Sequence, residues 1–159
     1  MTRTMVTLVM AISLWGCSRK HDDPLVASAR DSARHGELSV PRPILQVKSF
    51  AIGVDYYRSK LGFKLDWDHG TPADFGSVSR GDAVVFLCQG CSSSPGAWNM
   101  IFTRDVDKLY EELRRRHALI REPPTNKPWG MREMQVADPD GNVIRFGSGI
   151  SEDPTDSRR

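Results

Sequence analysis

Residues 128–146 of the chain read PWGMREMQVADPDGNVIRF, and this stretch decides the fold. We interpret it as two strands, residues 131–137 and 143–146, which are joined by a tight turn at DPDGN. In such a turn proline fixes φ and aspartate caps the backbone, and we expect Gly141 and Asn142 to take positive φ. The sequence therefore predicts a β-hairpin at the C-terminal end of the folded part.

The chain before this hairpin begins with one strand, one helix and three more strands. An apolar extended run over residues 40–47 leads to a helix that Ser49 is placed to cap and Gly62 is placed to end. Apolar residues recur in this helix with the period of an amphipathic helix. Three further strands are predicted over residues 63–68, 75–79 and 83–88.

The same succession then repeats after a linker rich in Gly, Ser and Pro at residues 89–96. A strand over residues 97–103 and a helix over residues 105–117 precede a short strand that begins near Ile120, and the C-terminal hairpin completes the half. Each βαβββ half has roughly 50 residues and cannot bury its apolar faces alone, so the two must pack together. The predicted fold class is α+β.

Composition restricts the classes of function. The chain has 159 residues, 39% hydrophobic and 26% charged, which fits one globular domain with extensions. A net charge of +2 is too small to indicate binding to nucleic acid. A mean hydropathy of −0.42 excludes a polytopic membrane protein.

The N-terminal residues 1–17 have the layout of a secretory signal, with Arg3 before a short apolar run. The final LWGC of this segment resembles a bacterial lipoprotein cleavage box, although the tryptophan departs from the usual small residue. The resemblance implies lipidation of Cys17 and a lipid-anchored location in the cell envelope. The alternative is a misassigned start codon and a cytoplasmic protein. We expect residues 18–39 to be a flexible tether, residues 40–150 the folded domain and residues 151–159 a disordered tail.

Cys88 and Cys91 form the one C-x-x-C of the sequence. No partner Cys or His stands at zinc-site spacing, and a thioredoxin-like pair belongs at a strand-to-helix junction rather than before a Ser-rich loop. The favoured interpretation is a strand cysteine and an unrelated loop cysteine. In an oxidising compartment the two could instead pair.

Several landmarks together resemble the glyoxalase/bleomycin resistance superfamily, which has the vicinal oxygen chelate fold. The first module, residues 42–90, contains YYR (56–58) and LGF (61–63). The second, residues 97–148, contains DVD (105–107) and the C-terminal hairpin. The resemblance implies that the two modules form a curved mixed sheet and that two chains form a strand-swapped homodimer.

In the metalloenzymes of this superfamily the ligands lie on the first and last strands of each module. The resemblance carries these positions onto Arg42, Trp98 and Arg145, and onto Val85 or Phe86. None of these side chains is a usable ligand for a divalent ion. We therefore expect no metal cofactor and no catalytic residue.

Aromatic side chains point instead to a binding cleft. Trp98, Met100 and Phe102 alternate along one strand and share a face. Trp129, Trp67 and Phe86 could add aromatic walls, and Glu133, Asp66 and Asp68 could supply negative charge. Aromatic walls stack well on heteroaromatic rings. The candidate ligand-binding residues are Trp98, Met100, Phe102, Trp129, Phe86, Trp67 and Glu133.

The nearest resemblance within the superfamily is to the bleomycin-resistance proteins, which sequester a cationic antibiotic in two clefts at a dimer interface. It implies a bleomycin-type antibiotic or another planar heteroaromatic as ligand. A cationic drug favours an acidic cleft, whereas residues 40–150 are slightly basic. Two alternatives stay open. One is a metal-dependent lyase, isomerase or dioxygenase with ligands such as His69 and Glu133, and the other is a non-enzymatic, membrane-anchored accessory domain.

Overall fold

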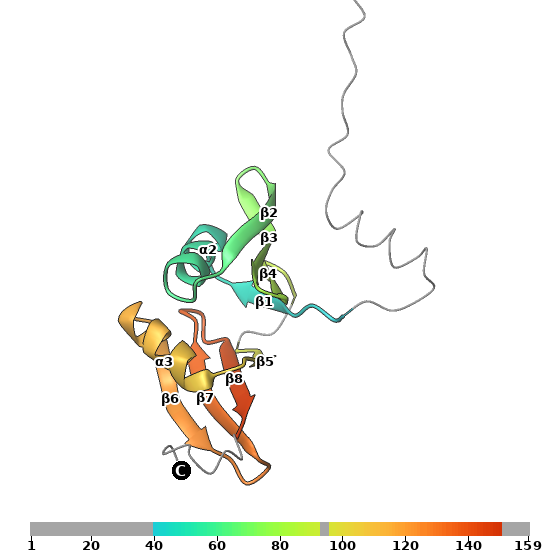
Figure 1. Cartoon of the computed structure of the whole chain (residues 1–159). Coiled ribbons are helices and arrows are strands. Elements are labelled where there is room, and N and C mark those ends of the chain that lie inside the picture. Colours follow the sequence, from blue (N-terminus) through green and yellow to red (C-terminus); the bar gives the residue numbers. More distant parts are fainter. Residues whose placement is uncertain (1–39, 93–95, 151–159) are drawn as a thin grey trace, which may run out of the picture. The chain divides into compact units, whose positions relative to one another are not determined.

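A computed structural model describes residues 40–92 and 96–150 of the chain (Figure 1). The predicted signal peptide at residues 1–17, with Cys17, lies outside the described residues. So do the predicted tether at residues 18–39 and the predicted tail at residues 151–159. Of the helices described, none is both long enough and apolar enough to cross a bilayer.

The described part is built from two βαβββ modules in succession. The elements of the first module are β1 (Ile44–Val47), α2 (Phe50–Ser59), β2 (Lys64–Gly70), β3 (Ala73–Arg80) and β4 (Ala83–Gln89). The elements of the second module are β5 (Trp98–Phe102), α3 (Val106–Arg115), β6 (Leu119–Asn126), β7 (Met131–Ala137) and β8 (Val143–Gly149).

Hydrogen bonds divide the eight strands between two four-stranded mixed sheets with the same topology (Figure 1). The first sheet has the order β1-β4-β3-β2 and the second has the order β5-β8-β7-β6. In each, the first strand runs parallel to the last strand of its module, and the other neighbours are antiparallel. The predicted α+β class and the two-module organisation are confirmed.

Prolines explain where two strands differ from the prediction. The first strand begins at Ile44 rather than at residue 40, because Pro41 and Pro43 have no N–H to give to a ladder. The strand near Ile120 is longer than predicted and continues through Pro123 and Pro124 to Asn126. It can do so because β6 is the edge of its sheet, where a missing donor can face away from the neighbouring strand.

Both helices begin at an N-cap, and the cap at Ser49 is the one that the sequence predicted. The Ser49 side chain accepts a hydrogen bond from the Ile52 N–H, and the Asp105 side chain accepts one from the Lys108 N–H. Both helices end earlier than predicted. After α2 the chain turns at Gly62 with φ of 72°, and after α3 it turns at His117 with φ of 57°.

The DPDGN turn corrects one prediction. Gly141 takes a φ of 87°, as expected, but Asn142 has no positive φ. Its side chain is instead buried and hydrogen-bonded, because the turn packs against other elements. The Asp138 carboxylate accepts hydrogen bonds from the backbone N–H groups of Asp140 and Asn142, both at 2.9 Å, and so caps the turn as predicted.

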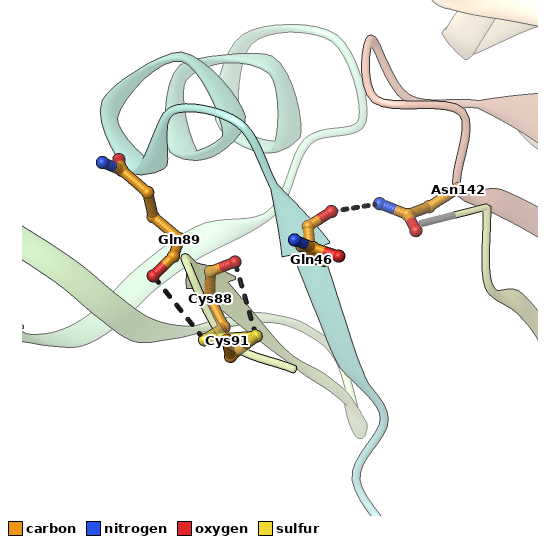
Figure 2. Close-up of a disulfide and its surroundings, with 5 residues drawn as sticks. All are labelled: Gln46, Cys88, Gln89, Cys91 and Asn142. Atoms are coloured by element: carbon orange, nitrogen blue, oxygen red, sulfur yellow. Dashed lines mark hydrogen bonds between the residues drawn. A yellow bond between two sulfur atoms is a disulfide. The ribbon is translucent and has the colours of Figure 1, made fainter. Parts of the chain in front are cut away.

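This turn joins the two modules. The Asn142 Nδ2 donates to the Gln46 backbone oxygen of β1 at 2.9 Å (Figure 2). The Asn142 Oδ1 accepts from the Ala97 N–H at 3.2 Å, directly before β5. The Tyr57 hydroxyl of α2 donates to the Asp138 carboxylate at 3.4 Å. We call Asn142, Asp138, Tyr57, Gln46 and Ala97 the module latch.

The latch is closed off from solvent. Asn142 and Tyr57 are fully buried and Asp138 is 3% exposed. Burial raises the pKa of the Asp138 carboxyl, although hydrogen bonds from Asn142 and Asp140 oppose this effect. Burial also raises the pKa of the Tyr57 hydroxyl, with the nearby Asp138 acting in the same direction. One apolar core contains buried side chains of both modules.

Cys88 and Cys91 form a disulfide at the end of β4 (Figure 2). The favoured prediction, two unrelated cysteines, is therefore wrong for this structure. The reason is the turn between them: Gly90 takes a φ of 76° and leaves the two Cα atoms 5.9 Å apart, within reach of a disulfide.

Candidate ligand-binding groove

A groove of about 450 Å³ opens on the face of the second sheet that points away from the core. Strand alternation builds it, because Asn99 and Ile101 of β5 are only partly exposed while their neighbours project outward. The exposed neighbours are Trp98 at 57%, Met100 at 38% and Phe102 at 73%. The apolar stripe predicted for this strand therefore lies along the groove.

An ion pair lies beside this stripe. Arg145 of β8 is the register partner of Met100, and its Nη1 lies 3.4 Å from the Oε2 of Glu133 on β7. The guanidinium carbon is 5.5 Å from the ring centroid of Trp98, a cation–π distance. The Trp129 Nε1 donates to the Glu133 Oε1 at 2.7 Å. Two indoles, a guanidinium and a carboxylate thus form one connected cluster.

A glycine lies beneath the cluster. Gly147 is the register partner of both Phe102 and Glu133. A Cβ at this position would lie 2.6 Å from the Met100 Cε and 3.2 Å from the Glu133 Cγ. A side chain at residue 147 would therefore force the Met100 and Glu133 side chains to shift.

The outer face of the first sheet carries a second group of aromatics. Trp67 lies 5.6 Å from Phe75 and 5.5 Å from Phe86, measured between ring centroids. Beside them the Asp66 carboxylate accepts hydrogen bonds from the hydroxyls of Ser77 at 3.1 Å and Ser79 at 2.8 Å. Partial burial would raise the pKa of Asp66, but the hydrogen bonds from Ser79, Lys64 and Ser77 together lower it.

The predicted site residues thus fall into two groups. Trp98, Met100, Phe102, Trp129 and Glu133 line the groove of the second sheet. Trp67 and Phe86 lie on the first sheet, so a single chain does not bring all seven into one pocket.

Sequence reasoning missed Phe75 and Met131 and did not place Arg145 in the groove. The alternation of Phe75, Ser77 and Ser79 and that of Met131, Glu133 and Gln135 were signals that could have found the two missed residues.

The positions that the resemblance assigns to metal ligands do not fit a metal ion. Arg42 is exposed directly before β1, and Trp98 and Arg145 stack on each other. Of the two neighbours left open by the resemblance, Phe86 is the register partner of Ile44 and lies on the outer face, whereas Val85 is 1% exposed in the core. None of these side chains donates a lone pair to a divalent ion.

No other donor set in the described part of the chain replaces them. Within residues 40–92 and 96–150, no three His, Cys, Asp or Glu side chains are grouped closely enough to hold a metal ion. His69 belongs to the first sheet and Glu133 to the second, so the suggested alternative ligands are not on one sheet. The groove presents two exposed indoles, flexible thioether side chains and one ion pair, and aromatic surfaces of this kind stack well on flat rings.

Comparison with known proteins identifies relatives of this architecture. The family model described as "Glyoxalase/Bleomycin resistance protein/Dioxygenase superfamily" matches residues 39–146. A search of curated proteins gave no match.

Three solved structures are similar to the chain. TioX from Micromonospora sp. ML1 has a TM-score of 0.62 at 20% identity, over 70% of this chain and 100% of that one, a similarity of fold. The bleomycin-binding protein from bleomycin-producing Streptomyces verticillus, solved with copper(II)-bleomycin, has a TM-score of 0.61 at 25% identity, over 72% and 98% of the two chains. TnmS3, an antibiotic binding protein from Streptomyces sp. CB03234, has a TM-score of 0.60 at 28% identity, over 71% and 98%.

Proposed function

Because the chain belongs to the glyoxalase/bleomycin resistance protein/dioxygenase superfamily, we propose that it binds and sequesters a small molecule and performs no chemistry on it. The proposed ligand is a flat heteroaromatic compound of the antibiotic type, with a bleomycin-type drug as the first candidate to test. Two of the similar solved proteins, at 25% and 28% identity, are described as binding bleomycin and an antibiotic, and this supports the proposal.

One observation carries the proposal: two tryptophans stand largely exposed in one groove. Trp98 and Trp129 are 57% and 59% exposed, although indole rings are usually well buried. Both rings contact the Arg145–Glu133 pair, Trp98 through the guanidinium and Trp129 through the carboxylate. Aromatic surface that is held in place but left uncovered marks an interaction site.

Removal of the Trp98 ring is expected to weaken ligand binding. A stacked aromatic pair contributes about 0.5–1.5 kcal/mol beyond its buried area, so Trp98→Ala should raise the dissociation constant by about tenfold or more. Isothermal titration calorimetry with bleomycin, with and without copper, measures this directly. A thermal-shift screen over flat antibiotics extends the test, since a ligand at 100 times its dissociation constant stabilises the fold by about 2.7 kcal/mol.

The control for this experiment is Ile52→Ala on α2. Ile52 is 62% exposed and does not line the groove, so its loss removes apolar surface elsewhere. Equal dissociation constants for the wild type and Trp98→Ala would mean that the ligand does not bind in this groove. If no compound of the screen binds the wild-type chain, the proposed function itself is wrong.

We also propose that the chain forms a homodimer in solution. Exposed aromatic and aliphatic side chains occur on the outer faces of both sheets, among them Phe102 at 73% and Ile44 at 47% exposure. Exposed apolar side chains of this size on two faces favour association. Light scattering coupled to size-exclusion chromatography should give twice the mass of the chain, and the mass of a monomer at micromolar concentration would contradict the proposal.

The lipid anchor remains a prediction about Cys17. Metabolic labelling of expressing bacterial cells with a palmitate analogue tests it, and the matched control is Cys17→Ser. A wild-type chain that carries no label would remove both the anchor and the cell-envelope location.

A further inference from the structure

The two charged side chains of the groove differ in how far a ligand can reach them. Glu133 is only 3% exposed, and its Oε2 is covered although it has no hydrogen-bond partner among the described residues. Its other carboxylate oxygen accepts from the Trp129 indole. The carboxylate is therefore enclosed by the protein and is not offered to an incoming molecule.

Arg145 is the charge that a ligand meets. Its side chain is 33% exposed, about eight times the 4% of the Glu133 side chain. The Nε is buried, so the terminal nitrogens of the guanidinium are the ones that a ligand in the groove can reach. These nitrogens carry donors in a fixed plane that suits a carboxylate or sulfonate.

The neighbouring charged side chains do not occupy the Arg145 donors that suit a carboxylate or sulfonate. Glu122 of β6 is close enough to interact with Arg145, but its Oε1 is paired with Lys127 and also accepts from Thr125. Its Oε2 accepts from the Gln135 side chain at 2.6 Å. Both oxygens of the Glu122 carboxylate are thus engaged with protein donors, while the terminal nitrogens of Arg145 keep donors for a ligand.

We propose that the groove selects flat aromatic molecules that carry an anionic acceptor group, a carboxylate or a sulfonate, which Arg145 binds while the ring system stacks on Trp98 or Trp129. The inference rests on the proposed function and adds the charge of the ligand to it. Glu133 holds the guanidinium in place and does not contact the ligand.

This selectivity runs against a cationic ligand. An ammonium group in the groove would meet the exposed guanidinium and could not reach the enclosed carboxylate. Like charges at short range repel, and this effect is strong where solvent is partly excluded. A cationic glycopeptide should therefore bind this chain more weakly than an anionic compound with the same ring system.

The test uses one ring system with three substituents. Anthraquinone-2-carboxylate, 2-(hydroxymethyl)anthraquinone and 2-(aminomethyl)anthraquinone are titrated into the full-length protein at pH 7 and constant ionic strength, by calorimetry. The wild type should bind the carboxylate at least about tenfold more tightly than the ammonium compound, as a charge-assisted hydrogen bond predicts. The neutral alcohol should lie between them.

Variants assign the preference to a residue. Arg145→Gln should reduce the difference between the carboxylate and the ammonium compound to about twofold or less. Glu133→Gln removes the negative charge beside the guanidinium, so the carboxylate compound should remain the tightest of the three ligands. The double variant Arg145→Gln/Glu133→Gln leaves no unpaired buried charge, so it should stay folded. If it unfolds at a temperature close to that of the wild type and also shows no preference, the lost preference is not caused by unfolding.

Arg115→Gln is the control for net charge. Arg115 is exposed in α3 and does not line the groove, and its replacement changes the total charge by the same amount. It should leave the preference unchanged, because exposed charges beyond a Debye length, about 8 Å at physiological salt, are screened.

Each outcome bears on the inference. Equal affinities for the three compounds would overturn the charge selectivity and leave the proposed function standing. Tightest binding of the ammonium compound, abolished by Glu133→Gln, would make the site a cation site and reverse the assignment. If Arg115→Gln and Arg145→Gln reduced the preference for the carboxylate compound equally, the preference would come from the net charge of the protein and not from a contact with Arg145. Failure of all three compounds to bind the wild type would overturn the inference, whereas the proposed function is decided separately by the bleomycin titration and the thermal-shift screen.

Discussion

Replacement of Asn142 by alanine is expected to destabilise the folded protein by about 3 kcal/mol. The side chain is fully buried and makes three hydrogen bonds, to the Gln46 oxygen, the Ala97 N–H and the Asp138 carboxylate. Its loss leaves these groups without partners in a closed site, and an unsatisfied buried polar group costs about 1–3 kcal/mol. Because the contacts reach β1 and the start of β5, both modules lose support at once.

The destabilisation should depend on pH through Asp138. The pKa of this carboxyl is raised by burial, so its contribution to stability is full below the pKa of the unfolded chain and is lost as pH rises through the folded value. The side-chain amide of Asn142 and the backbone N–H groups of Asn142 and Asp140 limit this shift by stabilising the carboxylate. Asn142→Ala removes the side-chain donor and keeps the two backbone donors. The cost of the substitution should therefore be larger at pH 7 than at pH 4, measured by urea denaturation at both values.

Asn99→Ala is the matched control for this prediction. Asn99 lies on β5, and its Nδ2 is buried with no hydrogen-bond partner in the described part of the chain. Asn99→Ala removes no hydrogen bond of that nitrogen, so it should change the free energy of unfolding by less than about 1 kcal/mol. Equal losses for the two variants would mean that Asn142 does not hold the modules together.

Introduction of a methyl group at Gly76 is the second large effect. A Cβ at this residue of β3 would lie 2.6 Å from the Phe50 Cζ and 2.6 Å from the Trp67 backbone oxygen. Phe50 is 4% exposed and belongs to the core, and a strand carbonyl cannot move without breaking its ladder. We expect Gly76→Ala to cost about 2–3 kcal/mol through overpacking.

The control for Gly76→Ala is the same substitution at Gly149. A Cβ at Gly149 meets nothing within 4 Å, and this glycine has no positive φ, so alanine should be tolerated. Both variants are compared by thermal and urea unfolding. If Gly76→Ala unfolds at the same denaturant concentration as Gly149→Ala, α2 is packed on the sheet more loosely than the structure indicates.

Local chemistry explains which predictions succeeded. The helix caps at Ser49 and Asp105 depend on one side chain and the N–H three residues later, so a few residues of sequence suffice to predict them. The positive φ of Gly141 is equally local, because only glycine enters that region without strain. The outward stripe on β5 follows from alternation alone.

Predictions that depended on partners distant in sequence were less complete. The role of Asn142 could not be found from its own turn, because one acceptor lies 96 residues earlier, at Gln46. The choice between Val85 and Phe86 required the register of β1 on β4, which the sequence leaves open by one residue. The pairing of Cys88 with Cys91 depended on how Gly90 turns the chain.

The amino-acid sequence was enough to predict the two modules, the helix cap at Ser49, the turn at Gly141, and the unsuitability of Arg42, Trp98 and Arg145 as metal ligands. These properties are fixed by periodicity, by side-chain conformation over a few residues and by the chemistry of single groups.

The three-dimensional arrangement was needed to show that Arg145 is partly exposed while Glu133 is enclosed, and that the aromatics separate into two groups on two sheets. The reason is that exposure and charge access depend on which strands lie side by side. Residues far apart in the chain set that arrangement together.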